Sequence, residues 1–147
     1  MIKIICVGKI KEKYLVSAIE EYSKRISKYT KIEIIDLPDY DINNKDVVLE
    51  KEKENILKHI NNKDYIITLE IEGKEIKSVN ELKKIASGDK PVLIILGNEE
   101  KGISDIVKSN CDEQIIIPFA GMSQGKKCNI DSLNVAQAAS IIFYNLL

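Results

Sequence analysis

The stretch KPVLIILG, residues 90–97, decides the fold class of this chain. Five apolar residues follow one another between Pro91 and Gly97, with no polar residue among them. Strands that are buried on both faces, as in the middle of a parallel sheet, have such continuous apolar runs. We therefore expect this stretch to form a central strand of a parallel sheet.

Similar apolar stretches alternate along the chain with charged segments of helical period. This alternation is typical of an α/β fold whose mainly parallel sheet is sandwiched by helices. The further strands are expected at residues 2–8, 31–37, 64–74 and 113–119, and the helices at residues 12–29, 43–60, near Ser78 and Glu81, and at 131–144. No repeat, low-complexity tract or linker divides the chain, so we expect a single domain over residues 1–147.

Composition restricts the classes of function. The chain has 22 basic and 23 acidic residues, which nearly cancel, so an RNA site must be a local patch. The three cysteines, Cys6, Cys111 and Cys128, show no C-x-x-C pairing, and no cleavable signal sequence precedes them. This usage predicts a reduced, cytoplasmic protein. No apolar run is long enough to cross a bilayer, and no metal is expected.

Two strand exits carry the candidate functional residues, because ligands of open α/β sheets bind beyond the carboxyl ends of the strands. The first exit is LGNEEKGIS, residues 96–104, where Gly97 permits close backbone approach and Asn98 and Glu99 stand at the end of a strand. It matches neither G-x-G-x-x-G nor G-x-x-x-x-G-K-[ST], which disfavours nucleotide di- and triphosphates as ligands. Taken alone, the stretch is also explained as a polar turn.

The second exit is IPFAGMSQGKKCNIDSLN, residues 117–134, a polar loop that leads into the last helix. Ser132 and Asn134 lie at the amino end of that helix, where exposed backbone amides favour capping or anion binding. A plain helix cap is the simpler interpretation of these two residues. The helix that follows has apolar or small residues around much of its girth, so we expect it to be buried on more than one side.

Together the two exits resemble a known family. VLIILGNEEKGIS, CDEQIIIPF and SLNVAQAASIIFY are similar to the second and third motifs of the SpoU (TrmH) branch of the SPOUT RNA methyltransferases. The first two-thirds, through IKIICVGKIKEKYLVSAIEEYSKRISKY and YIITLEIEGKEIKS, resembles the H-type large-subunit pseudouridine N3-methyltransferases. The histidine- and arginine-rich carboxyl terminus of that H type is absent, and the sequence ends on FYNLL.

The resemblance implies a deep trefoil knot near the carboxyl terminus, S-adenosylmethionine as cofactor, RNA as substrate, and a homodimer that uses the first and last helices. The residues that match cofactor-contacting positions are Leu69, Gly97, Ile117, Phe119 and Leu133. The residues that match acceptor-side positions are Glu99, Ser132 and Asn134, with Arg25, the single arginine, as a group that orients the acceptor. Lys126 and Lys127 are expected to contact the RNA backbone.

The acceptor atom stays open at this stage. The SpoU-like motifs favour ribose 2′-O methylation of tRNA or rRNA, and the similarity of the first two-thirds favours N3 methylation of pseudouridine in large-subunit rRNA. A non-catalytic RNA-binding knot and a flavodoxin-like domain with coincidental turns are the alternatives from other classes. Binding of S-adenosylmethionine separates the enzyme from the coincidental turns.

Overall fold

The computed structural model of the protein describes residues 1–8, 10, 13–75, 79–97, 102–116 and 135–146. Strands and helices alternate through these ranges, as the sequence pattern predicts. In chain order the elements are β1 (Ile2–Val7), α1 (Lys13–Ile26), β2 (Ile32–Leu37), α2 (Lys45–Leu57), β3 (Tyr65–Glu75), α3 (Val79–Ala86), β4 (Val92–Leu96), α4 (Asp105–Ser109), β5 (Glu113–Ile116) and α5 (Val135–Leu146).

The strands form one sheet in the order β2-β1-β4-β3-β5, and every neighbouring pair is parallel. Strand β4 lies in the middle, and each of its five residues is buried. Its neighbours are in register on both sides, with Ile94 paired to Ile4 of β1 and to Ile67 of β3. The expectation of a central parallel strand is confirmed.

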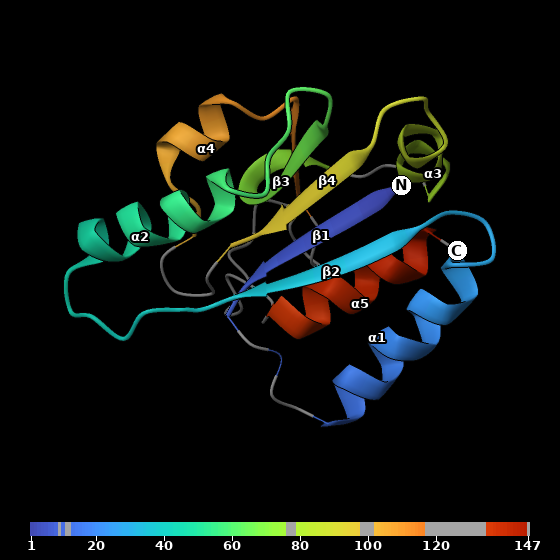
Figure 1. The fold of residues 1–147 in the computed structure, drawn as a ribbon, viewed down its shortest axis with the longest axis horizontal. Helices are drawn as coiled ribbons and strands as arrows, with labels where there is room; N and C mark the ends of the chain where they lie inside the picture. The colour runs from blue at the N-terminus through green and yellow to red at the C-terminus, as the bar shows by residue number, and fades with distance from the viewer. Residues whose placement is uncertain (9, 11–12, 76–78, 98–101, 117–134, 147) are drawn as a thin grey trace, which may run out of the picture.

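Helices cover both faces of the sheet (Figure 1). Helices α1, α3 and α5 lie on one face, where side chains of β1, β3 and β4 pack against Ile19, Ala139 and Ile142. Helices α2 and α4 lie on the other face, where Ile56 and Val107 contact a second apolar cluster. Burying apolar area on both faces is what stabilises a parallel sheet of this kind.

Helix α1 buries the apolar stripe that its sequence predicts, since Leu15, Ile19 and Ile26 are all buried. Helix α2, which is rich in charged residues, buries one of them. Its Glu52 is 2% exposed, because it lies four residues after Val48 and four before Ile56 and so shares their inward stripe. Other charged residues of α2, such as Glu50 and Lys51, are exposed, whereas the side chain of Lys53 is 13% exposed.

Helix α5 is buried on more than one side, as predicted. Ala138, Ala139 and Ile142 are at most 3% exposed, and the helix contacts α1, α3 and the sheet. Within the described ranges, no helix is both long and apolar enough to span a bilayer. The chain segment in which a knot would be formed, residues 117–134, lies outside the described residues, so the knot stays a prediction.

Candidate functional site at the carboxyl end of the sheet

All strands point the same way, so β1, β2 and β4 end together. We call this the carboxyl end of the sheet, and the side where the strands begin the amino end. Val7 pairs with Leu37, and the next amide, that of Gly8, donates to the Leu37 carbonyl at 2.9 Å. Cys6 of β1 and Leu69 of β3 both pair with Leu96, the last residue of β4. The predicted cofactor residues Leu69 and Gly97 therefore come together at the carboxyl end.

Leu69 marks a change in the sheet. It is the last residue of β3 that pairs with β4, and the register between β3 and β5 shifts between Leu69 and Lys74. Its side chain is partly buried against the cluster that also contains Leu96 and Ile115. The strand ends at this point thus combine an apolar surface with backbone groups outside the regular hydrogen-bonding pattern of the sheet.

Gly97 lies tightly against the turn that leads into α4. A Cβ atom at Gly97 would lie 2.4 Å from Cγ1 of Ile103 and 2.8 Å from the carbonyl oxygen of Gly102. The space beside this glycine is thus filled by the turn that leads into α4, and Ile103 itself is buried. A branched residue at this position would therefore disturb the fold first.

Gly8 and Gly102 shape the same end of the sheet through their backbone. Both have positive φ angles, 101° and 71°, which residues with a side chain rarely adopt. The ideal Cβ position of Gly8 lies 3.8 Å from Oδ2 of Asp39, whereas nothing lies within 4 Å of that of Gly102. Turns built by glycine backbone, with a carboxylate nearby, characterise this end of the molecule.

Helix α5 begins at the carboxyl end of the sheet. Figure 1 shows the carboxyl terminus of the chain beside the start of β1, so α5 runs antiparallel to the strands. The amino end of α5, where Ser132 and Asn134 precede Val135, therefore faces the carboxyl end of the sheet. Several predicted site residues lie outside the described residues. They are Glu99, Ile117, Phe119, Lys126, Lys127, Ser132, Leu133 and Asn134.

Arg25 is placed far from Leu69 and Gly97 within one chain. It lies in the last turn of α1, which leads through residues 27–31 to the start of β2 at the amino end of the sheet. Helix α1 has 14 residues, which corresponds to about 20 Å of length. Nε of Arg25 donates to Oε1 of Glu21 at 3.0 Å, and both side chains are more than half exposed. The structure thus does not bring Arg25 together with the other predicted site residues of the same chain.

The described cysteines are packing residues, as predicted. Cys6 is fully buried, and burial, with a smaller contribution from the charge of Asp36, raises the pKa of its thiol to about 12. The Sγ of Cys111 donates to the carbonyl of Lys108 at 2.9 Å and accepts from the hydroxyl of Thr68 at 3.4 Å. Among the described residues, no group of three or more histidine, cysteine or acidic side chains could hold a metal ion.

Comparison with known proteins gives a consistent result. A family model described as "Predicted SPOUT methyltransferase" matches residues 1–122. The "Ribosomal RNA large subunit methyltransferase H" of Caldicellulosiruptor saccharolyticus is 39% identical over 130 residues, 84% of this chain and 82% of that protein. The protein of the same name from Pediococcus pentosaceus is 42% identical over 125 residues, 78% of this chain and 77% of that protein.

A solved structure has the same arrangement of elements. The probable methylase family protein of Haemophilus influenzae Rd KW20 superposes with a TM-score of 0.58 at 16% sequence identity. The match covers 99% of this chain and 62% of the other, so this chain spans about three-fifths of that protein's length. A likeness at this level of identity concerns the fold alone.

Proposed function

The chain belongs to the SPOUT methyltransferase family and is an S-adenosylmethionine-dependent RNA methyltransferase, and we propose that it methylates N3 of a pseudouridine in large-subunit ribosomal RNA. The sequence similarity that supports this substrate covers most of this chain and most of the length of each of the two relatives. Both relatives are named as ribosomal RNA large subunit methyltransferases. We therefore place the ribose 2′-hydroxyl second, although the SpoU-like motifs favoured it.

The position of Arg25 is the structural observation that supports a base nitrogen. A ribose 2′-hydroxyl is a weaker acid than a ring N–H and needs more help to lose its proton. The single guanidinium of the chain lies at the amino end of the sheet, about one helix length from Gly97, where it pairs with Glu21. A ring N–H needs less help from a guanidinium to lose its proton. A base nitrogen therefore suits a site that contains no arginine of the same chain.

The described residues of the carboxyl end suit S-adenosylmethionine. This cofactor carries no phosphate and needs an apolar bed with backbone donors and acceptors. Leu69 and Leu96 provide an apolar wall. Two carboxylates, Asp36 near the end of β2 and Asp39 after it, lie at this end, whereas a phosphate site would need cations. We place the rest of the cofactor site at Ile117, Phe119 and Leu133, and we keep Gly97 as the residue that holds the turn beside it.

The chain's own residues would orient the acceptor, exclude water and accept its proton. S-adenosylmethionine, when bound, supplies an electrophilic methyl group on a sulfonium for in-line displacement. Glu99, Ser132 and Asn134 would organise the acceptor at the carboxyl end, since Glu99 follows β4 and the other two precede α5. Holding acceptor and donor in line is worth several orders of magnitude in rate.

We propose a homodimer that uses the outer faces of α1 and α5. The small residues Ala138 and Ala139 of α5 are buried within the chain and do not face a partner. The outer faces instead present Tyr14 and Tyr144, which are 69% and 64% exposed. A monomer in light scattering at micromolar concentration would contradict this arrangement.

The RNA would be contacted by Lys126 and Lys127 beside the site, and the protein would work in the cytoplasm, where its cysteines stay reduced. Replacing both lysines by alanine should weaken RNA binding, flatten its dependence on salt and leave cofactor affinity unchanged. Calorimetry with S-adenosylmethionine and a filter-binding series at several salt concentrations measure the two quantities.

Methyl transfer to purified ribosomal subunits tests the proposed function. The substrate is large subunits from a strain that lacks this gene, and the donor is S-adenosylmethionine with a labelled methyl group. We expect label on a pseudouridine base, with every neighbouring linkage still cut by alkali. Subunits from the parent strain are the control and should accept little label. Label in an alkali-resistant dinucleotide would identify a ribose 2′-O-methyl group and overturn the proposed acceptor.

A further inference from the structure

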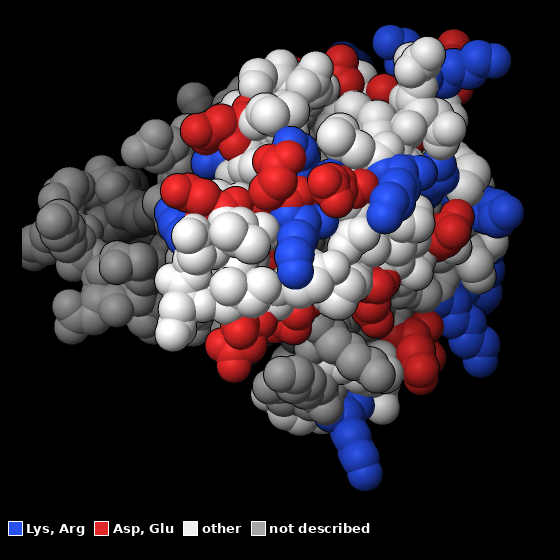
Figure 2. Space-filling model, turned by 60° about the vertical axis from the view of Figure 1, so that its left-hand side comes forward, with Lys and Arg blue, Asp and Glu red and all other residues white. Residues whose placement is uncertain are grey.

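The basic residues of this nearly neutral chain are unevenly distributed. The segments that lead into β2, β3 and β4, residues 24–31, 58–64 and 83–91, contain nine basic and two acidic residues. Residues 36–54, which follow β2 and form most of α2, contain seven acidic and three basic residues. Figure 2 shows acidic side chains across the middle of one face and lysine or arginine side chains toward its right-hand margin.

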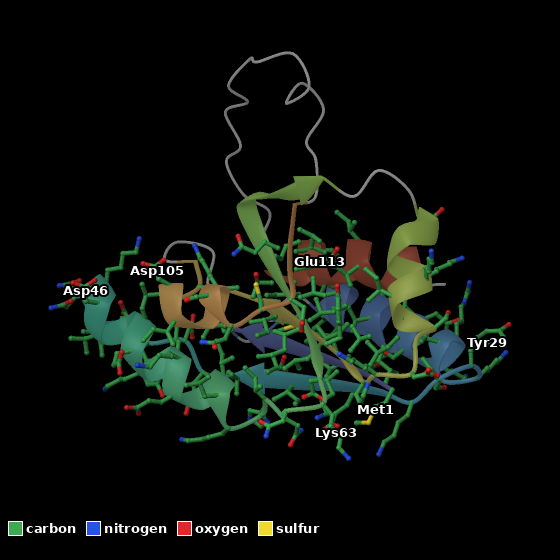
Figure 3. All side chains as sticks on the ribbon, turned by 90° about the horizontal axis from the view of Figure 1, so that it is seen from above. Met1, Tyr29, Asp46, Lys63, Asp105 and Glu113 are labelled. Atoms are coloured by element: carbon green, nitrogen blue, oxygen red, sulfur yellow. The ribbon has the colours of Figure 1, made fainter. Side chains whose placement is uncertain are left out.

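The parallel topology brings the three basic segments to the amino end of the sheet. Backbone hydrogen bonds join them: Ile2 donates to Lys31 at 2.8 Å, Val92 to Met1 at 3.0 Å, and Tyr65 to Pro91 at 2.8 Å. Neighbouring strands are about 4.8 Å apart, so the line from the start of β2 to the start of β3 spans about 14 Å. Figure 3 shows Met1, Lys63 and Tyr29 on one side of the molecule and Asp46 and Asp105 on the other.

Four lysines along this line have free charges. Lys28, Lys31, Lys63 and Lys90 are exposed, and within the described ranges no carboxylate lies within ion-pair distance of them. Lys3 behaves differently, because its Nζ lies 3.7 Å from Oδ2 of the buried Asp64. An open depression lies beside this pair, between the start of β1 and the turn before β3.

An exposed aromatic ring lies within the same surface. Tyr29 is 87% exposed, more than any other large apolar or aromatic side chain found exposed in the described part of the chain. It stands in the turn between α1 and β2, where Lys28 precedes it and Lys31 follows two residues later. A ring that is free to stack, flanked by cations, is the combination with which proteins hold unpaired nucleotides.

We propose that Lys28, Tyr29, Lys31, Lys63 and Lys90 form a second RNA-binding surface, at the end of the sheet opposite the methyl-transfer site. The lysines bind phosphates of a ribosomal RNA segment, and the Tyr29 ring stacks on one of its bases. The 14 Å line of lysines is long enough to contact several successive phosphates of one RNA strand. This inference rests on the proposed function, because it takes ribosomal RNA as the substrate.

The distance between the two ends gives this surface a specific task. It lies about 20 Å, the length of α1, from the carboxyl end of the same chain. RNA held there cannot have its bound nucleotide methylated by that site. The surface therefore sets which RNA is bound and in what register, while the reacting nucleotide lies farther along the RNA or at the partner subunit.

Binding of large ribosomal subunits at several salt concentrations tests the surface. The probe is subunits from a strain that lacks this gene, and the variant is Lys28→Ala with Lys31→Ala. We expect affinity to fall about ten-fold or more, and the slope of log K against log salt to decrease by about 0.7 to 0.9 for each lost phosphate contact. The affinity for S-adenosylmethionine should not change.

The matched control is Lys45→Ala with Lys51→Ala, which removes the same charge from exposed positions on α2. Lys51 contacts the Tyr40 ring at 5.1 Å at the surface, so its loss should leave folding nearly unchanged. Equal affinity losses in the two double variants would show a general charge effect and overturn the proposal.

Tyr29 separates stacking from charge. Tyr29→Ala should weaken binding by about five- to a hundred-fold, the scale of one lost stacked base, whereas Tyr29→Phe should bind like the parent protein. Two outcomes remain distinguishable. In the first, the parent protein methylates the subunits, but the variants bind them with the same affinity and the same salt dependence as the parent. The RNA-binding surface is then wrong, and the proposed function stands. If the parent protein does not methylate the subunits, the proposed function fails.

Discussion

The two ends of the sheet are built in different ways. At the carboxyl end, Gly8, Gly97 and Gly102 shape turns through their backbone, and Leu69 supplies an apolar wall. At the amino end, side chains define the surface, with exposed lysines such as Lys31 along the strand starts and a buried carboxylate, Asp64, beside Lys3. In the function proposed above, backbone geometry would receive the cofactor at one end, and side-chain charge would receive RNA at the other. Substitutions at the two ends should therefore have different consequences.

The largest expected effect is that of Gly97→Val. A Cβ atom at this position would lie 2.4 Å from Ile103 and 2.8 Å from a backbone oxygen, so the turn into α4 has to move. We expect the free energy of unfolding to fall by at least about 3 kcal/mol, the upper range for overpacking. Denaturant unfolding of the purified variant measures it.

Gly102→Ala is the control for this variant. Its φ angle of 71° strains an alanine, but nothing lies within 4 Å of the added atom, so the loss should be about 1 kcal/mol. Equal losses at the two glycines would show that the contact with Ile103 is not what makes Gly97 necessary.

At the amino end, Asp64→Ala should cost about 2 kcal/mol of unfolding free energy. Oδ2 of Asp64 accepts from the amide of Asn61 at 3.0 Å and lies 3.7 Å from Nζ of Lys3, and its side chain is 2% exposed. Its removal leaves these donors without a partner in a mostly buried place. Asp64→Asn, which retains an acceptor, should lose less.

The exposed Asp89 provides the matched control, and Asp89→Ala should change the free energy of unfolding by less than about 0.5 kcal/mol. A similar loss for Asp89→Ala and Asp64→Ala in urea unfolding would mean that the amino end is held by overall charge and not by this buried carboxylate.

Cys6 makes stability depend on pH in the alkaline range. Burial, and secondly Asp36, raise the pKa of its thiol from 9.0 to about 12 in the folded chain. Between these values the unfolded thiol loses its proton while the folded one keeps it, so the free energy of unfolding falls as pH rises. The contribution is at most about 1.4 kcal/mol per pH unit.

Unfolding of the parent protein and of Cys6→Ala at several pH values from 9 to 11 isolates this contribution. We expect the Cys6→Ala curve to be less steep. Parallel curves would show that the buried thiol is not the group responsible.

The smallest effect is expected for Arg25→Ala on stability. Arg25 and Glu21 form an ion pair one helical turn apart, with side chains 59% and 53% exposed. Such surface pairs contribute about 0.5 kcal/mol or less. Lys24→Ala, at an exposed neighbouring position on the same helix, is the control. A larger loss of stability for Arg25→Ala than for Lys24→Ala in thermal unfolding would indicate that Arg25 has a further contact.

Much of the fold follows from the sequence because continuous apolar runs, such as Val92–Leu96, have few alternatives to a buried strand. The burial of Glu52 could not be predicted, because the charges around it outweigh its spacing from Val48 and Ile56. The role of Gly97 could not be predicted, since a sequence does not say whether ligand or protein fills the space beside a glycine.

The amino-end surface could not be predicted for a topological reason. Its lysines come from three segments far apart in the sequence, and Lys31, Lys63 and Lys90 become neighbours only when three strands run parallel. The predicted acceptor-side residues Glu99, Ser132 and Asn134 stay predictions, since they lie outside the described residues. The sequence signal that was available is the turn SKYTK, residues 27–31, which places an aromatic ring among lysines.

The assignment of the cofactor to one end of the sheet is tested most directly by titrating the isotope-labelled protein with S-adenosylmethionine and following its backbone amide resonances. The account predicts that the amides of Leu69, Leu96 and Gly97 shift on binding. It predicts that the amides of Lys31, Lys63 and Lys90 stay in place until RNA is added. Cofactor-induced shifts confined to the amino end of the sheet would contradict the account.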